Sequence, residues 1–140
     1  MPSVFSRVIA GEIPGRFVWK DPDVVAFLTI APLKTGHTLV VPRREVDHWI
    51  DLDPALAAKV FAVSQNVARG VAKAFPCTKV GVIVAGLEVP HVHVHLVPMS
   101  DLGDLDFARQ DRNPDPRVMD DAAERLRAAL RSLGYSSVTD

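Results

Sequence analysis

The chain has 140 residues and a mass of 15.3 kDa, which is the size of one domain and too small for two of ordinary size. Hydrophobic residues make up 48% and charged residues 24%, and no apolar run approaches the roughly 18 residues of a membrane span, so disordered, fibrous and membrane classes are excluded. Sixteen Lys and Arg against 17 Asp and Glu give a net charge of -1, which argues against a broad basic surface for nucleic acid.

The single cysteine, Cys77, excludes an intrachain disulfide. The N-terminus has neither the basic start nor the long apolar run of a secretory signal. We therefore expect a cytoplasmic protein that binds neither nucleic acid nor membrane.

The first half of the chain predicts a short helix followed by three strands. Ser3–Ala10 has apolar residues at helical spacing, with Ser3 as the N-cap and Gly11 as the stop. Three β-rich runs, separated by Pro-, Asp- and Gly-containing turns, predict an antiparallel meander. They are Phe17–Lys20, Val24–Ile30 and His37–Val41.

The second half predicts a long helix, two more strands and a C-terminal helix. Asp53-Pro54 is an N-cap followed by proline at the first helical position, and apolar residues follow at intervals of three and four, namely Leu56, Val60, Val63, Val67 and Val71. Lys79–Ala85 and His91–Val97 read as strands joined by a short turn. Asp115-Pro116 starts the last helix, with the predicted apolar stripe Val118, Ala122, Leu126, Leu130 and Leu133.

The pattern as a whole predicts one α+β domain over residues 1–140, with an antiparallel sheet of about five strands, one long central helix and a C-terminal helix. Residues 100–140 supply an irregular segment and that last helix. The irregular part, Ser100–Pro116, is a candidate border of a ligand pocket, although its residues indicate no particular contact.

The strand His91–Val97 carries the clearest functional signal, because His91, His93 and His95 alternate with aliphatic residues. Successive side chains of a strand point to opposite faces, so the three imidazoles share one face and the aliphatic residues pack into the core. Three imidazoles are costly to bury without partners, and Thr, Lys or Glu are commoner on a surface strand. Purely structural histidines are the alternative interpretation.

Two kinds of chemistry suit such a strand. His91 and His95 lie roughly 13 Å apart along an extended chain, so one zinc ion, with bonds of about 2.0–2.1 Å to nitrogen, cannot bind all three histidines. His93 and His95 could bind a metal together with His37 from a neighbouring strand, and this alternative stays open. Nucleophilic attack on phosphorus fits better, since a neutral imidazole is a competent nucleophile when a neighbour fixes its tautomer.

The HVHVHLV run resembles the signature of the histidine triad (HIT) family. Further motifs match in order along the chain: AGEIP at Ala10–Pro14, AFLTIAP at Ala26–Pro32, GHTLVVP at Gly36–Pro42 and EVP at Glu88–Pro90. The resemblance implies a nucleotide-binding HIT-like fold and a homodimer with a continuous sheet. It also implies hydrolysis or transfer at the α-phosphate of a nucleotide, such as a nucleoside phosphoramidate or a dinucleoside polyphosphate.

By this resemblance the four histidines are catalytic. His93 would attack the α-phosphorus and form a nucleotidyl-imidazole that water then hydrolyses, and His95 would contact the phosphate and the leaving group. His91 would orient the ring of His93, and His37 would line the same site, with a surface position as its alternative. No cofactor is required in this scheme.

The resemblance also implies a purine nucleotide or a related phosphate compound as substrate, with a slot for its base. The matching apolar positions are Val4, Phe5, Val8, Phe27 and Ile30, which could equally be plain core. Thr29 stands where many members have an aspartate that binds the ribose, so nucleoside affinity is expected to be weaker. Val80 and Leu87 replace polar contacts, and the carboxylate of Glu88 lies near the expected phosphate.

The sequence predicts no required metal and leaves zinc open as an alternative. Zinc-bearing members use two cysteines and a histidine where this chain has Ser3, Ser6 and Glu45. Glu45, His48 and His91 are the tentative ligands of an oxygen and nitrogen site, and a solvated turn is the alternative. Two other functions therefore stay open beside the enzyme: a nucleotide-binding regulator with little turnover, and a His-ligated metallohydrolase.

Overall fold

The computed structural model describes residues 1–139, and their fold is built on a five-stranded antiparallel sheet. The strand order is β1-β2-β3-β5-β4. The strands are β1 Phe17–Lys20, β2 Val24–Leu28, β3 Thr38–Pro42, β4 Lys79–Ile83 and β5 Val94–Met99. The helices are α1 Val4–Ile9, α2 Pro54–Ala74 and α3 Pro116–Ser132. The predicted α+β architecture is confirmed; Asp140, the last residue of the predicted domain, lies outside the described residues.

The predicted meander is confirmed: β1 has the predicted bounds, β2 ends two residues early, and β3 starts and ends one residue late. β2 stops at Leu28 because the chain turns at Thr29, whose hydroxyl accepts a hydrogen bond from the amide of Ala31. β3 starts after His37, whose amide bonds to the carbonyl of Lys34 in the preceding turn. Turn geometry at the two ends of the loop therefore shortens β2 and shifts β3 by one residue.

β5 is shifted toward the C-terminus, to Val94–Met99 instead of His91–Val97. The amide of His91 bonds to Val89, and that of Val92 bonds to Val46 in the loop after β3, so these residues lie outside the ladder. β4 in turn ends at Ile83, opposite His95, and not at Ala85 as predicted. Only one of the three alternating histidines therefore lies in a strand.

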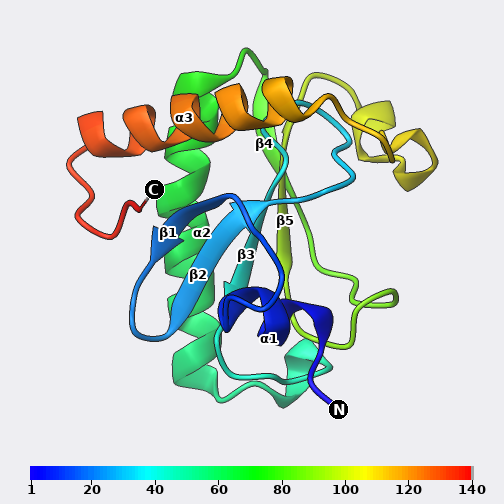
Figure 1. Cartoon of the computed structure of the whole chain (residues 1–140), viewed down its shortest axis with the longest axis vertical. Helices are drawn as coiled ribbons and strands as arrows, with labels where there is room; N and C mark the ends of the chain where they lie inside the picture. The colour runs from blue at the N-terminus through cyan, green and yellow to red at the C-terminus, as the bar shows by residue number, and fades with distance from the viewer. Residues whose placement is uncertain (140) are drawn as a thin grey trace.

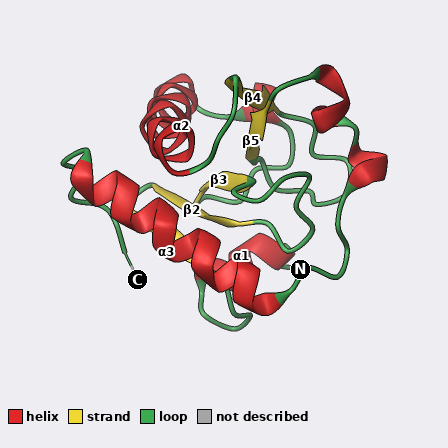
Figure 2. Cartoon of the chain, turned by 90° about the horizontal axis from the view of Figure 1, so that it is seen from above, coloured by secondary structure: helices red, strands yellow, loops and turns green. Residues whose placement is uncertain are grey.

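α2 covers one face of the sheet, and α1 lies on the opposite face (Figures 1 and 2). The α2 face holds the larger core, to which α2 contributes Val63 and Val67 and β5 contributes Val94 and Leu96. The N-cap Asp53 accepts a hydrogen bond from the amide of Ala55, as the Asp-Pro motif predicts.

α3 crosses the end of this layer and packs on α2 (Figure 2). Its predicted stripe is partly wrong, because Val118 and Leu133 are 47% and 41% exposed. Met119 and Ala123 join Ala122, Leu126 and Leu130 in the core instead. The buried stripe therefore runs along a slightly different line of the helix than the one predicted.

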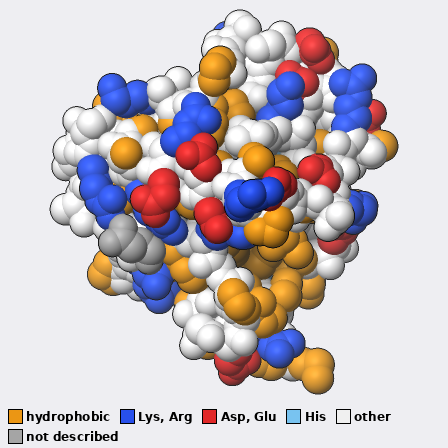
Figure 3. Space-filling model, turned by 45° about the horizontal axis from the view of Figure 1, so that its top comes forward, with side chains coloured by type: hydrophobic (Ala, Val, Ile, Leu, Met, Phe, Trp, Pro, Cys, Tyr) orange, Lys and Arg blue, Asp and Glu red, His pale blue; other side chains and the backbone are white. Residues whose placement is uncertain are grey.

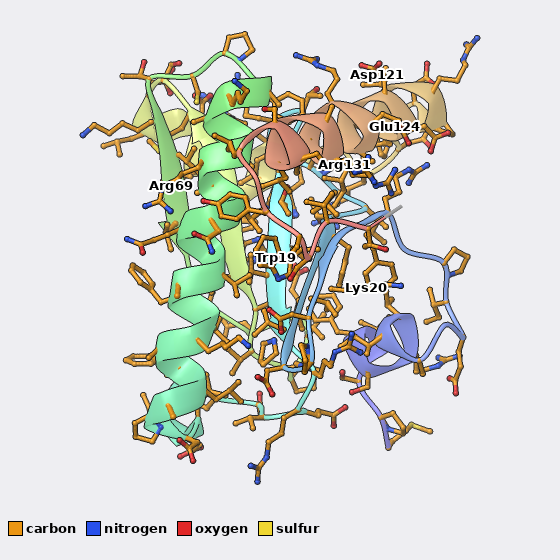
Figure 4. The ribbon with its side chains drawn as sticks, turned by 90° about the vertical axis from the view of Figure 1, so that its left-hand side faces the viewer. Trp19, Lys20, Arg69, Asp121, Glu124 and Arg131 are labelled. Carbon is orange, nitrogen blue, oxygen red and sulfur yellow. The ribbon has the colours of Figure 1, made fainter. Side chains whose placement is uncertain are left out.

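The strand β1 forms one edge of the sheet, and this edge is partly covered. The amide of Lys20 bonds to the carbonyl of Ser137, and Trp19 forms an isolated bridge to Val138. Trp19 of β1, labelled in Figure 4, belongs to the core that α2 covers, and its ring lies 5.5 Å from that of Tyr135. The other edge strand, β4, has no such cover among the described residues.

Two short 3-10 helices, Leu102–Leu105 and Phe107–Arg109, interrupt the segment predicted to be irregular. Within residues 1–139, no helix has both the length and the apolar character needed to span a bilayer.

Candidate functional site

Four histidines gather on the face of the sheet opposite α2. Val94 and Leu96 point into the larger core, so the alternating side chain of His95 points to the other face. His93 lies beside it, with 4.8 Å between the two ring centroids. The predicted alternation therefore holds for the side chains although His91 and His93 precede β5.

His93 presents an unprotonated nitrogen. Its Nδ1 lies 2.7 Å from the backbone carbonyl oxygen of His91, and because a carbonyl only accepts, Nδ1 carries the hydrogen. The lone pair is then on Nε2. Burial lowers the pKa of His93 below its ordinary value, outweighing the opposing effects of that hydrogen bond and the Glu88 carboxylate. The ring is therefore neutral, as a nucleophile must be.

His95 presents the opposite group, an N–H. The amide of Leu33 donates to Nδ1 of His37 at 3.0 Å, so the hydrogen of His37 lies on Nε2. That nitrogen is 2.9 Å from Nδ1 of His95, which must accept, leaving the hydrogen of His95 on Nε2. The backbone amide of Leu33 thus fixes the tautomer of His37 and, through it, the tautomer of His95. The Nε2–H of His95 is left free to donate a hydrogen bond.

Both rings of this pair are neutral at ordinary pH. Burial, followed by the neighbouring His95 and His93, lowers the pKa of His37 to about 3. Burial and then His93 lower the pKa of His95 to about 4. A bound anion would oppose these shifts, because a nearby negative charge favours the imidazolium.

His93 and His95 line a pocket of about 740 Å³, a volume typical of small-molecule sites. Hydrophobic side chains gather in a hollow of the face that Figure 3 shows. All six predicted binding residues line the pocket: Val4, Phe5, Val8, Phe27, Thr29 and Ile30. Val8 and Phe27 also belong to the smaller core cluster, whereas Ile30 is 79% exposed. The binding and core interpretations are thus compatible for this set.

His37 and His91 do not line the pocket; they lie behind the two rings that do. His37 is bonded to His95 as described, and it is buried and not at the surface. His91 is fully buried, with Nδ1 2.7 Å from the hydroxyl of Ser3 and Nε2 2.7 Å from the carbonyl of Pro42. Both therefore support the rings of His93 and His95 and do not themselves face the pocket.

The segment Ser100–Pro116 borders the pocket, as expected, through residues that the sequence did not single out. Phe107 lies with its ring 5.0 Å from that of His95, and Gln110 and Arg112 also line the pocket. The side chain of Gln110 bonds to the carbonyl of Ala31, which fastens the 100–116 segment along this wall. No periodicity or motif marks these residues, because only the tertiary contact makes them part of the site.

Val80, Leu87 and Glu88, at which the sequence departs from the histidine triad pattern, lie in different places. Glu88 and Leu87 line the pocket, and Leu87 is almost fully exposed. Val80 packs against the larger core and does not line the pocket. The position of Val80 therefore offers the pocket no contact, polar or apolar.

The tentative metal site of Glu45, His48 and His91 is not assembled. Within residues 1–139, no three His, Cys, Asp or Glu side chains are placed to hold a metal ion. Both nitrogens of His91 are bonded, and Glu45 accepts from the amide of Ser3 and the hydroxyl of Ser6. Because the nitrogens of His91 and the carboxylate of Glu45 are engaged within the protein, and His48 is not placed with them to complete a group of three, these residues as they stand do not fit a zinc ion.

Comparison with known proteins places these features in context. Residues 10–102 match the family model described as HIT domain. The chain is 32% identical over 143 residues to a HIT-like protein of Mycobacterium tuberculosis, covering 94% of this chain and 99% of that one. It is 34% identical over 91 residues to the asymmetrical bis(5'-nucleosyl)-tetraphosphatase of Schizosaccharomyces pombe, covering 61% and 48%. A zinc-bound histidine triad family protein from Mycobacterium smegmatis superposes with a TM-score of 0.80 at 29% identity, covering 93% and 94%.

Proposed function

The chain belongs to the HIT domain family, and from that premise we propose that it hydrolyses or transfers nucleotides at the α-phosphate through a covalent nucleotidyl-histidine. One observation carries this proposal: a lone pair on Nε2 of His93 and an N–H on Nε2 of His95 side by side in one pocket. The tetraphosphatase relative supports the phosphoanhydride class of substrate.

The proposed reaction has two displacements. Nε2 of His93 attacks the α-phosphorus, a P–N bond forms, and the bond to the leaving group breaks with its electron pair. The Nε2–H of His95 donates a hydrogen bond to the phosphate or the leaving atom, where negative charge develops. Water then attacks phosphorus and loses a proton to solvent, and His93 leaves with the electron pair on Nε2.

His91 and His37 act as supports in this scheme. The carbonyl of His91 holds the Nδ1–H of His93 and stays bonded while the ring is positively charged in the intermediate. His37 keeps the donor of His95 on the pocket side. A phosphate leaving group departs without a proton, whereas an amine takes its proton from solvent, because the neutral ring of His95 donates a hydrogen bond and not a proton.

The pocket supplies the binding half of the proposal. Phe5 and Phe27 offer aromatic surface to a base, with 5.6 Å between their ring centroids. The hydroxyl of Thr29 accepts from the amide of Ala31 and keeps one hydrogen to donate to a sugar. Without a carboxylate at this position, sugar binding is expected to be weaker than in members with aspartate.

Intact-protein mass spectrometry tests the proposal. After brief incubation with a nucleoside phosphoramidate or a dinucleoside polyphosphate, wild type should gain the mass of one nucleoside monophosphate. His93→Ala should show no adduct and His95→Ala a slower one, whereas His48→Ala, an exposed histidine outside the pocket, should match wild type. Nucleotide binding with neither adduct nor product would favour the regulator instead, and an adduct on His93→Ala would refute the nucleophile.

We further propose that two copies of the chain associate through β4. The strand is an uncovered edge among the described residues, and Val82 on it is 48% exposed. An open edge with unpaired backbone groups is a template for another strand. Two such edges paired antiparallel would give the continuous sheet that the family resemblance implies.

A further inference from the structure

We propose that Ser3 and Glu45 are positioning residues that hold the ring of His91 and, through it, the backbone carbonyl that orients His93. The role rests on the function proposed above. It assigns to the start of α1 a task that neither the pocket nor the histidines themselves reveal.

Ser3 is the direct contact. Its hydroxyl lies 2.7 Å from Nδ1 of His91, and Nε2 of His91 lies 2.7 Å from the carbonyl of Pro42. The carbonyl fixes the hydrogen on Nε2, so Nδ1 accepts and the hydroxyl of Ser3 donates. With both nitrogens bonded and the ring fully buried, His91 can neither rotate nor exchange tautomer without losing a bond.

Glu45 holds Ser3 in place from the loop after β3. Its Oε1 accepts from the amide of Ser3 at 2.6 Å and from the hydroxyl of Ser6 at 2.7 Å. The hydroxyl of Ser3 also accepts from the amide of Ser6 at 3.0 Å, so the N-cap and the carboxylate tie the same turn. These bonds lower the pKa of Glu45 to about 2, and the carboxylate therefore stays charged across the working pH range.

The bonds matter because α1 has only six residues, too few to be stable as an isolated helix, so its position depends on tertiary contacts such as these. Phe5 on this helix packs edge-on against His93, with 4.8 Å between the ring centroids. The carbonyl of His91 meets Nδ1 of His93 from another side at 2.7 Å. Two of the contacts that orient the nucleophile thus depend on the turn that Ser3 and Glu45 hold.

A matched pair of variants tests the hydroxyl of Ser3. Ser3→Thr keeps a hydroxyl and Ser3→Val replaces it with a methyl group of the same shape, so any crowding is common to both. At saturating dinucleoside polyphosphate, Ser3→Val should form the nucleotidyl adduct about tenfold more slowly than Ser3→Thr, because a buried acceptor loses its donor and the nucleophile shifts. Ser132→Ala, which removes a hydroxyl bonded only within α3, should match wild type.

A spectroscopic readout separates positioning from general damage. The ¹⁵N resonance of His91 Nδ1 should move toward that of an unbonded nitrogen in Ser3→Val and stay near its wild-type value in Ser3→Thr. A second pair of variants tests Glu45 by the rate of adduct formation. Glu45→Gln keeps an oxygen that can accept the same hydrogen bonds, so it should form the adduct faster than Glu45→Ala. Thermal unfolding should confirm that every variant is folded at the assay temperature.

The outcomes distinguish this inference from the function on which it rests. If wild type forms no adduct with any substrate, the proposed function fails, while the nitrogen resonance still tests the contact. If wild type forms the adduct and Ser3→Val reacts as fast as Ser3→Thr, the positioning role is refuted. A loss confined to substrate affinity, with the rate at saturation unchanged, refutes it as well.

Discussion

At the scale of single residues, backbone groups fix the tautomers of three histidines: His93, His37 and His95. The carbonyl of His91 fixes His93, and the amide of Leu33 fixes His37 and through it His95. Backbone groups do not titrate, so these tautomers stay constant while the pH changes. A carboxylate partner would instead raise the pKa of a histidine and favour the charged ring, which is useless as a nucleophile.

This arrangement makes stability depend on pH. The pKa of His37 is about 3 in the folded chain, against about 6.5 in an unfolded one. Below pH 6.5 the unfolded chain binds a proton that the folded chain refuses, so stability falls as the pH drops from 6.5 toward 3. Between pH 6.5 and 5, His37 should cost about 2 kcal/mol.

Urea unfolding at pH 7.5 and 5.0 measures this effect. His37→Asn keeps an oxygen that can accept from the amide of Leu33 but does not titrate, so it should lose less stability between the two pH values than wild type. His48→Asn, at an exposed position, is the control and should behave like wild type. An equal loss in wild type and His37→Asn would show that His37 is protonated freely in the folded chain.

At the scale of elements, helix ends are predictable because their signals are local. Ser3, Asp53 and Asp115 each cap the helix that the sequence assigns to them. Strand ends are less predictable from the sequence. The start of β5 depends on the hydrogen bond from the amide of Val92 to the carbonyl of Val46, which is distant in the chain. The shared face of the histidines survives this shift, since it follows from alternation and not from the ladder.

The loop before His37 gives an element-scale prediction. Gly36 has φ of +99°, and a Cβ there would lie 2.5 Å from Cδ2 of the buried Phe75. Gly11 has a similar φ of +83° but open space around a Cβ. Gly11→Ala should therefore lose about 1 kcal/mol from backbone strain alone, and Gly36→Ala about 3 kcal/mol from strain and crowding together.

Denaturant unfolding of the two alanine variants compares these costs. A larger loss in Gly36→Ala assigns the difference to the Phe75 contact, which fixes the loop next to His37. Equal losses would mean that Phe75 moves aside freely and that the loop is not held from this side.

At the scale of the whole molecule, the sequence predicts the histidines and the apolar slot of the pocket but not the individual residues that the segment 100–116 adds to it. Alternation and motif order identify His93, His95 and the apolar slot. Phe107 and Gln110 come from a segment without periodicity, and the bond from Gln110 to Ala31 exists only once the chain has folded. Likewise, the sequence could not show that the proposed metal ligand His91 is hydrogen-bonded to Ser3 and Pro42, because these contacts form only in the folded chain.

Association through β4 is the prediction that belongs to this scale. Light scattering at micromolar concentration should give wild type twice the 15.3 kDa of one chain. Val82→Lys places a charge on the open edge and should give the mass of one chain, because two edges brought together would bury like charges. Val118→Lys is a matched control, since Val118 on α3 is 47% exposed against 48% for Val82, and it should remain a dimer. A single-chain mass for wild type would refute the dimer, and a dimer of Val82→Lys would move the interface away from β4.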